Sequence, residues 1–250
     1  MNYIIKEEGG FRYIDEGQGQ TLLLLHGLFG ALSNWADVIE EFRQDYRIVI
    51  PIMPLYEMPA KEAGIESLTD IIEKFVVLKN LSNLTLLGNS LGGHVALAYT
   101  LRQQQNVKKL VLTGSSGLFE NQMGGSYPKR GSYEYVADRV AYTFYDPKVA
   151  TKELIDEVFD ITTNSQKALN TVYIARSAQR NNMADSLGQI TVPTCLIWGL
   201  NDTITPPSVA HDFNRLMPNS ELWFIDHCGH APMMEQPLEF NRIVHQFLKK

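Results

Sequence analysis

Residues 88–93 read Gly-Asn-Ser-Leu-Gly-Gly and follow the apolar run Leu84–Leu87. The pattern G-x-S-x-G is typical of a serine on a sharp turn between a strand and a helix. Glycines are needed on both sides of the serine because side chains there would collide with the neighbouring chain. The stretch therefore predicts a strand that ends near residue 87, a hydroxyl at Ser90 held above a sheet, and a following helix.

Outward from this turn, short apolar runs alternate with segments of helical periodicity. This is the pattern of an α/β protein with a mostly parallel sheet that has helices on both faces. The predicted strands span residues 3–5, 12–15, 22–25, 47–50, 84–87, 109–112, 194–198 and 221–225. The predicted core helices span residues 34–42, 68–78, 93–102, 208–216 and 238–248. The first two strands are short and polar, which indicates an antiparallel edge of this eight-stranded sheet.

The alternation stops between Gly117 and Leu187, where helical periodicity continues without a convincing strand. We therefore predict one domain, residues 1–250, with a core made of 1–116 and 188–250 and an inserted helical cap at about 117–187. The predicted cap is rich in tyrosines, which either pack its helices together or face a pocket. These are Tyr127, Tyr133, Tyr135, Tyr142, Tyr145 and Tyr173.

The charge and hydropathy pattern limits the kind of partner. The net charge is −6 and no basic run is longer than the terminal Lys249 and Lys250, so a surface for nucleic acid is not expected. No apolar stretch approaches the ~20 residues that span a bilayer, and the first residues lack the pattern of a secretion signal. We expect a cytoplasmic protein that acts on a small molecule, without a membrane partner and with an oligomeric state that the sequence leaves open.

A serine hydroxyl needs a base to take its proton, and histidine has a suitable ordinary pKa of about 6.5. His230 lies in a loop with Gly229 and Pro232 after the last predicted strand, at the sheet edge where Ser90 is expected. A carboxylate must orient the imidazole ring, and Asp202 directly follows the strand 194–198. The sequence predicts Ser90 as nucleophile, His230 as general base and Asp202 as the orienting acid.

Three neighbouring residues offer alternatives for these roles. His227 is the nearest rival base, Asp226 could replace the acid, and Cys228 offers a thiol nucleophile close to His230. A strand-turn-helix setting, however, exists only around Ser90. Structural roles are expected for the remaining histidines: His26, His94, His211 and His245.

Acyl transfer passes through an oxyanion, which needs hydrogen-bond donors already in place. The predicted donors are the backbone N–H groups of Leu91 and of Leu28, the latter within the loop 26–30, His-Gly-Leu-Phe-Gly. Phe29 and Met233 are predicted to line the substrate pocket under the cap. This chemistry implies no metal ion and no organic cofactor.

Four segments, taken together and in this order, resemble the α/β-hydrolase superfamily. They are residues 26–30, 88–94, 198–202 and 229–237. The resemblance is to its capped serine hydrolases, which include small-molecule esterases and the meta-cleavage product C–C hydrolases, and it implies the α/β-hydrolase fold. One segment departs from the family pattern, because residues 51–56 read Pro-Ile-Met-Pro-Leu-Tyr instead of the usual Asp-x-x-Gly-x-Gly turn.

Three functions are compatible with these residues. The first is cleavage of a small, largely apolar carboxylic ester through an acyl-enzyme on Ser90. The second is hydrolysis of a C–C bond in a vinylogous diketo acid, with Arg176 or Arg180 of the cap as the carboxylate anchor. Many C–C hydrolases have an aromatic residue where this chain has Ala231, so we rank ester hydrolysis first. The third is a receptor-like ligand-binding protein of the same fold.

Overall fold

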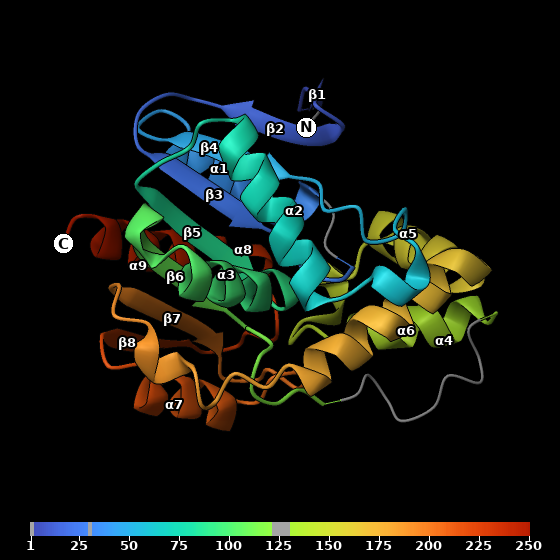
Figure 1. Cartoon of the computed structure of the whole chain (residues 1–250). Helices are drawn as coiled ribbons and strands as arrows, with labels where there is room; N and C mark the ends of the chain where they lie inside the picture. Colours follow the sequence, from blue (N-terminus) through green and yellow to red (C-terminus); the bar gives the residue numbers. More distant parts are fainter. Residues whose placement is uncertain (1–2, 30–31, 122–130) are drawn as a thin grey trace.

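The computed structural model describes residues 3–29, 32–121 and 131–250, so Tyr127 lies outside the described residues. Within these ranges, eight strands form one sheet in the order β1-β2-β4-β3-β5-β6-β7-β8 (Figure 1). The strands are β1 (Lys6–Glu8), β2 (Phe11–Glu16), β3 (Thr21–Leu25), β4 (Arg47–Pro51), β5 (Leu84–Asn89), β6 (Val107–Thr113), β7 (Thr194–Gly199) and β8 (Ser220–Ile225). The β1–β2 and β2–β4 pairs are antiparallel and the others parallel. The predicted mostly parallel sheet with an antiparallel edge is confirmed.

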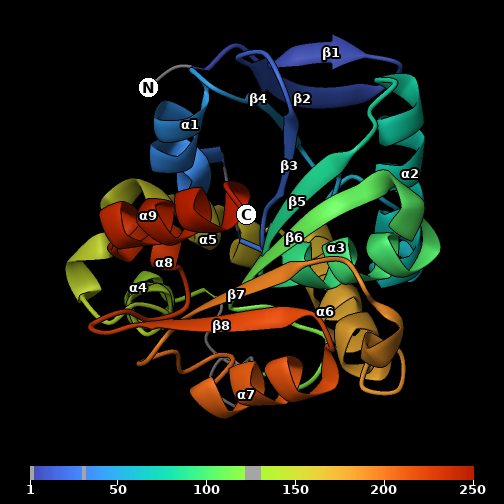
Figure 2. The ribbon, with the colours of Figure 1, turned by 90° about the vertical axis from the view of Figure 1, so that its left-hand side faces the viewer.

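Helices cover both faces of this sheet. On one face lie α1 (Ala36–Phe42) and α9 (Pro237–Leu248); on the other lie α2 (Ile65–Leu78), α3 (Leu91–Arg102) and α7 (Pro207–Leu216) (Figure 2). Short helical segments complete the core: η1 (Leu32–Trp35), η2 (Ala60–Glu62), η3 (Gln104–Asn106), η5 (Leu187–Gln189) and α8 (Pro232–Glu235). The two apolar layers explain why the predicted strands are nearly continuous runs of Leu, Ile and Val.

Strand β3 shows how a single apolar run contributes side chains to both apolar layers. Leu22 and Leu24 pack against the α1 and α9 face, whereas Leu23 and Leu25 pack against the α2 and α3 face. All four side chains are fully buried. Successive side chains of a strand point to opposite faces, so the positions of a doubly covered strand are mostly apolar. Each such leucine stabilises the fold by roughly 1.5–3 kcal/mol.

The first predicted strand is wrong in its position. The predicted strand spans residues 3–5, but β1 spans Lys6–Glu8 and Ile4 is exposed. The reason is the turn that follows: Gly9 and Gly10 both have positive φ, 57° and 83°, and they connect Glu8 directly to its partner Phe11. Strand pairing begins next to this turn. The prediction relied instead on the apolar residues that precede β1.

Two predicted helices begin elsewhere in the structure. The helix expected from residue 34 starts with the 3-10 turn η1, and α1 begins at Ala36. The helix expected from residue 68 begins at Ile65, whose N–H donates to the hydroxyl of Ser177 at 3.0 Å. Ser177 therefore provides the N-terminal hydrogen-bond acceptor from a distant helix, which local sequence signals do not contain.

Between β6 and β7 the described residues contain helices and no strand. Besides η5, these are α4 (Tyr133–Ala141), η4 (Pro147–Val149), α5 (Lys152–Thr163) and α6 (Ser165–Arg180), and α4 to α6 gather at one end of the sheet (Figure 1). Val136, Val140 and Val158 form a small apolar cluster between α4 and α5. Tyr133 joins the same two helices, because its hydroxyl donates to Asp156 at 2.6 Å. The division into core and cap stays a prediction that this arrangement supports.

His94 is expected to make the fold sensitive to acid. It lies in α3 with no exposed surface, and burial lowers its pKa from 6.5 to about 4. Between these two values the unfolded chain binds the proton more readily than the folded one, so stability falls as the pH falls through this window. The loss should approach about 3 kcal/mol near pH 4. Urea unfolding at pH 7 and pH 4.5 should show a smaller pH-dependent loss in His94→Gln than in the wild type.

The exposed His211 of α7 provides the control for this measurement. His211→Gln makes the same substitution on the surface and should keep the pH dependence of the wild type. An unchanged pH dependence in His94→Gln would contradict the assignment.

Candidate active site

Ser90 occupies the turn between β5 and α3. Its backbone has φ 53° and ψ −119°, a left-handed conformation that side chains rarely adopt. A Cβ on Gly92 would lie 2.0 Å from the carbonyl oxygen of Leu25, and one on Gly88 would lie 2.6 Å from that of Gly92. The glycines of the G-x-S-x-G pattern are therefore required by close backbone contacts. Ser90 itself is half-buried.

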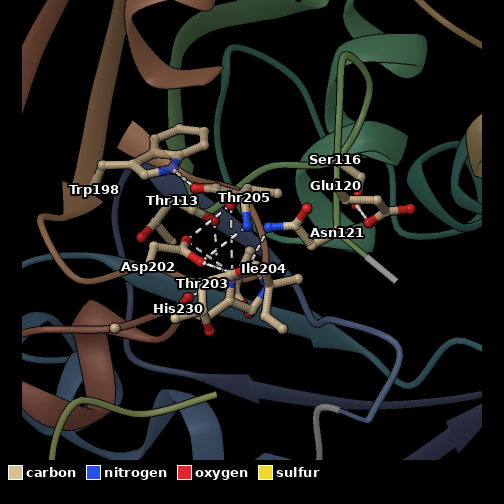
Figure 3. Close-up of polar contacts among 12 residues, drawn as sticks. Thr113, Ser116, Glu120, Asn121, Trp198, Asp202, Thr203, Ile204, Thr205 and His230 are labelled. Atoms are coloured by element: carbon tan, nitrogen blue, oxygen red, sulfur yellow. Dashed lines mark hydrogen bonds and ion pairs between the residues drawn. The ribbon is translucent and has the colours of Figure 1, made fainter. Parts of the chain in front are cut away.

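His230 and Asp202 form a buried pair in the loops after β8 and β7. The Nδ1 atom of His230 lies 2.9 Å from Oδ2 and 3.1 Å from Oδ1 of Asp202 (Figure 3). Asp202 is 3% exposed and His230 is 9% exposed. With Nδ1–H donating to the carboxylate, the lone pair on Nε2 is left to accept a proton.

The Asp202 carboxylate is held by two further residues. Its Oδ1 accepts the backbone N–H groups of Ile204 (2.8 Å) and Thr205 (2.9 Å), and its Oδ2 accepts the Thr205 hydroxyl at 2.8 Å (Figure 3). Thr205 is in turn fixed by Trp198, whose Nε1–H donates to its carbonyl oxygen at 2.8 Å. The orientation of this carboxylate is therefore set before any substrate binds.

The charges around His230 change its proton affinity. Burial by itself lowers the pKa of His230, but the nearby Asp202 carboxylate, with contributions from Glu120 and Glu235, outweighs burial and raises it above its ordinary value. Acidic groups stabilise the imidazolium form. The arrangement therefore favours a ring that can hold a proton taken from a hydroxyl.

The segment after β6 brings Ser90 close to His230. The N–H of Ser90 donates to the carbonyl of Thr113, and the N–H of Ser116 donates to that of Ser90, both at 3.1 Å. Between them, Gly114 has φ 51°, and a Cβ there would lie 2.9 Å from Nδ1 of His230. In the described part of the chain, no hydrogen bond joins the Ser90 hydroxyl directly to His230.

Two side chains that were not among the predicted site residues hold the His230 loop in place. The amide of Asn89 donates to the carbonyls of Thr113 and His230, both at 3.1 Å. Glu235 accepts the N–H of Gly229 on one oxygen and that of Tyr145 on the other, each at 2.7 Å. Asn89 thus links this loop to the serine turn, and Glu235 links it to the segment after α4.

The loop predicted to carry an oxyanion donor passes beside the serine. A Cβ on Gly27 would lie 3.4 Å from Cβ of Ser90. His26 accepts the N–H of Met53 on Nε2 (3.1 Å), so its proton is on Nδ1, which lies 2.9 Å from the carbonyl of Gly27. Burial lowers the pKa of His26, consistent with this neutral ring. His26 therefore has the structural role that was expected.

The atypical segment 51–56 also supports this loop. The hydroxyl of Tyr56 donates to the carbonyl of Leu28 at 2.5 Å. Leu91 is the first residue of α3, where backbone N–H groups have no partner within the helix. The assignment of the Leu28 and Leu91 N–H groups as oxyanion donors stays a prediction.

The predicted pocket residues occupy different surroundings. Phe29 packs against the valine cluster between α4 and α5. Met233 is 1% exposed and packs within the layer formed by α1 and α9. Arg176 and Arg180 are exposed on α6. The lining roles of Phe29 and Met233 stay predictions, and the exposed arginines are poorly placed to anchor a buried carboxylate.

The alternative catalytic residues have less suitable surroundings than Ser90, Asp202 and His230. His227 and Asp226 are exposed and pair with each other at 3.4 Å. Cys228 is fully buried, and burial raises the pKa of its thiol, which keeps it protonated and unreactive.

Other features lie away from this edge. A polar cavity of about 510 Å³ is located where the parallel strands begin, at the opposite edge of the sheet. It is lined by Gly19, Gln20, Thr21, Arg47, Asn80, Leu81, Ser82, Asn83 and Lys108. The described residues contain no group of three or more His, Cys, Asp or Glu side chains arranged to hold a metal ion. None of their helices is long and apolar enough to cross a membrane.

The serine turn, the histidine–aspartate pair and the helix-covered parallel sheet define a class of α/β enzymes rather than a single protein. Residues 20–144 and 160–237 match the family described as alpha/beta hydrolase fold, and the chain belongs to this family. It is a hydrolase of the α/β-hydrolase fold, with a mostly parallel sheet.

Three similar proteins indicate which members of the family this chain resembles. The chain is 29% identical over 257 residues to a 2-hydroxy-6-oxononadienedioate/2-hydroxy-6-oxononatrienedioate hydrolase of Cupriavidus pinatubonensis, covering 94% of this chain and 89% of that protein. It is 28% identical over 256 residues to a 2-hydroxy-6-oxo-2,4-heptadienoate hydrolase of Pseudomonas putida, covering 94% and 91%. A solved structure of MGS-MChE2, an alpha/beta hydrolase enzyme from a lagoon sediment metagenome of Mar Chica, Morocco, is 40% identical, with a TM-score of 0.82 and 98% of each chain covered.

These relatives correct the ranking of functions made from the sequence. The substrates in the names of the two curated relatives are hydroxy-oxo-dienoic acids, which contain no ester, so their hydrolysis breaks a C–C bond. Ester hydrolysis as the first choice is therefore wrong, and the second choice fits better. The ranking depended on Ala231, yet this residue is buried in the α1 and α9 layer, so its size reflects packing there.

Proposed function

We propose that this protein is a C–C bond hydrolase that acts on a 2-hydroxy-6-oxo-dienoate produced by meta-cleavage of an aromatic ring. The observation that carries the proposal is the agreement between the two curated relatives, each of which matches 94% of the chain. The geometry around Ser90 supports the same chemistry, because a serine, a histidine–aspartate pair and candidate oxyanion donors are located at one edge of the sheet.

The proposed reaction begins with ketonisation, in which the hydrogen of the 2-hydroxyl group moves to C5. Ser90 then attacks the C6 carbonyl while His230 takes its proton, and the Leu28 and Leu91 N–H groups stabilise the oxyanion. The C5–C6 bond breaks, and its electron pair is delocalised through the C3=C4 bond onto the 2-oxo group; the resulting dienolate takes a proton from His230 to give the 2-hydroxy-dienoate. Water, activated by His230, finally releases the acyl group as a carboxylic acid.

The leaving group explains why a serine hydrolase site can break this bond. A simple carbanion is far too basic to leave, whereas the carbanion at C5 is conjugated with the 2-oxo group and departs as a dienolate. The protein must therefore hold the substrate so that this conjugation is planar at the moment of cleavage. An anchor for the C1 carboxylate serves that purpose.

We assign this anchor to Arg139 on α4. Its Nε is buried and has no hydrogen-bond partner in the described part of the chain, although its guanidinium lies over the rings of Tyr135 and Tyr142. One turn further along, the carbonyl of Thr143 accepts the N–H of His230 at 2.9 Å. Arg139 is therefore on the helix that leads to the His230 loop, and a carboxylate would satisfy its unpaired donor.

The direct test uses chromophoric ring-fission dienoates with the purified protein. We expect loss of the dienolate absorbance together with stoichiometric formation of a 2-hydroxy-dienoate and a carboxylic acid, identified by mass spectrometry. A protein that reacts with a fluorophosphonate probe but cleaves no dienoate would contradict the proposal. Saturable binding of dienoates without cleavage would instead favour the receptor-like alternative.

A further inference from the structure

Glu120 lies between the serine turn and the Asp202 loop. The Ser116 hydroxyl donates to Oε2 of Glu120 at 2.8 Å (Figure 3), and the N–H of Ser116 donates to the carbonyl of Ser90 at 3.1 Å. On the other side, the N–H of Asn121 donates to the carbonyl of Ile204 at 2.6 Å. Residues 116–121 therefore run from the nucleophile to the acid loop, and Glu120 is fixed on this path.

The three carboxylates near His230 differ in how completely they are paired. Both oxygens of Asp202 accept hydrogen bonds, and both oxygens of Glu235 accept backbone N–H groups. Glu120 has one oxygen paired with Ser116, whereas no partner in the described residues contacts its Oε1. Its side chain is half-buried, so water screens its charge incompletely. The same charge contributes to the raised pKa of His230, which supports its closeness to the reacting groups.

We propose that Glu120 selects substrates by charge, so that the site prefers a dienoate with one carboxylate and an uncharged acyl end over a dicarboxylate. This inference rests on the proposed function. Every substrate of that class has a C1 carboxylate, for which Arg139 has an unpaired donor. A second carboxylate at the acyl end, bound next to Ser90, would be repelled by the charge of Glu120.

The size of this effect follows from Coulomb's law. Two like charges separated by about 7–10 Å at an effective dielectric constant of about 20 repel strongly enough to change a binding constant by about tenfold or more. Salt reduces the repulsion where the site is open to solvent. We therefore expect about a tenfold effect on the selectivity ratio, defined as kcat/KM for the monocarboxylate divided by kcat/KM for the dicarboxylate.

The experiment compares 2-hydroxy-6-oxo-2,4-heptadienoate with 2-hydroxy-6-oxononadienedioate. The wild type should favour the first, and Glu120→Gln should lower the selectivity ratio about tenfold, mainly through a lower KM for the dicarboxylate. A shift in the pKa of His230 changes kcat/KM for both substrates alike, so it cancels in a ratio measured within one variant. The matched control is Glu239→Gln on the exposed start of α9, which makes the same change in net charge and should leave the ratio unchanged. An unchanged ratio in Glu120→Gln, or an equal change in the control, would overturn the inference.

A second measurement separates this inference from the proposed function. Two phosphonate probes of equal length, one with an uncharged tail and one with a carboxylate tail, should modify Ser90 at different rates. The charged probe should react about tenfold more slowly with the wild type, and Glu120→Gln should remove most of the difference. If neither dienoate is cleaved, the proposed function fails. The labelling rates of the two probes still test the role of Glu120, because equal rates in the wild type would overturn that role.

Discussion

Replacing Ser90 with alanine is expected to lower kcat for dienoate cleavage by at least about 10⁴-fold and to abolish covalent labelling by a fluorophosphonate probe. The reason is that the buried His230–Asp202 pair and the loop around Gly27 converge on this turn. The variant should still fold, because alanine has the same Cβ at φ 53° as serine. Steady-state kinetics and gel fluorescence after labelling measure the two effects, with circular dichroism to verify folding.

The control for this prediction is Cys228→Ser. Cys228 is the alternative nucleophile close to His230 in sequence, but it is buried and burial keeps its thiol protonated. We therefore expect Cys228→Ser to retain the labelling of the wild type. Labelling that persists in Ser90→Ala, or that disappears in Cys228→Ser, would mean that the nucleophile has been assigned to the wrong residue.

The elements of the core could be predicted because each has a local cause. Strands covered on both faces are expected to be mostly apolar, and β3, β5 and β7 are buried along their whole length and consist mainly of apolar residues. The serine turn is equally local, because its glycines are imposed by contacts within a few residues and with the adjacent strand β3. Where the prediction was shifted, as at β1, the determining residues were the following Gly9 and Gly10.

The hydrogen bonds that complete the site could not be predicted in this way. The amide of Asn89 meets the carbonyl of His230 across 141 residues of sequence. The Tyr56 hydroxyl meets the loop of Leu28 from a segment that departs from the family pattern. Such pairs leave no periodicity or spacing, because they arise only when the sheet brings its loops to one edge. The hydrogen bond from Thr205 to Asp202, three residues away, is by contrast local in the sequence.

The chemistry of the substrate is the other part that the sequence left open. A serine, a histidine and an aspartate serve ester and C–C hydrolysis alike, since both reactions pass through an acyl-enzyme and an oxyanion. The two reactions differ in the stability of the leaving group. That stability is a property of the substrate, and the protein only holds the leaving group in position. The residue proposed to position it, Arg139, lies between β6 and β7, where the sequence pattern indicates helices without showing which faces meet the core.

Asp202→Asn is expected to lower kcat by about 10⁴-fold while leaving the fold intact. Oδ1 accepts two backbone N–H groups and must remain an oxygen, so the new amide nitrogen takes the place of Oδ2, 2.9 Å from Nδ1 of His230. It would donate to Nδ1 and force the imidazole proton onto Nε2, the atom that has to accept the serine proton. Loss of the carboxylate also removes the largest influence that raises the pKa of His230, so the acid limb of the kcat/KM profile should move to lower pH.

Asp226→Asn is the matched control, because it makes the same chemical change at the other carboxylate considered for this role. Asp226 is exposed and pairs with His227 rather than His230, so we expect less than about a twofold change in kcat, as for most surface substitutions. A large loss in Asp226→Asn with little loss in Asp202→Asn would show that His230 is oriented from the other side of its loop. Because the two aspartates differ so clearly in burial and in partners, the two variants should separate by about three orders of magnitude or more.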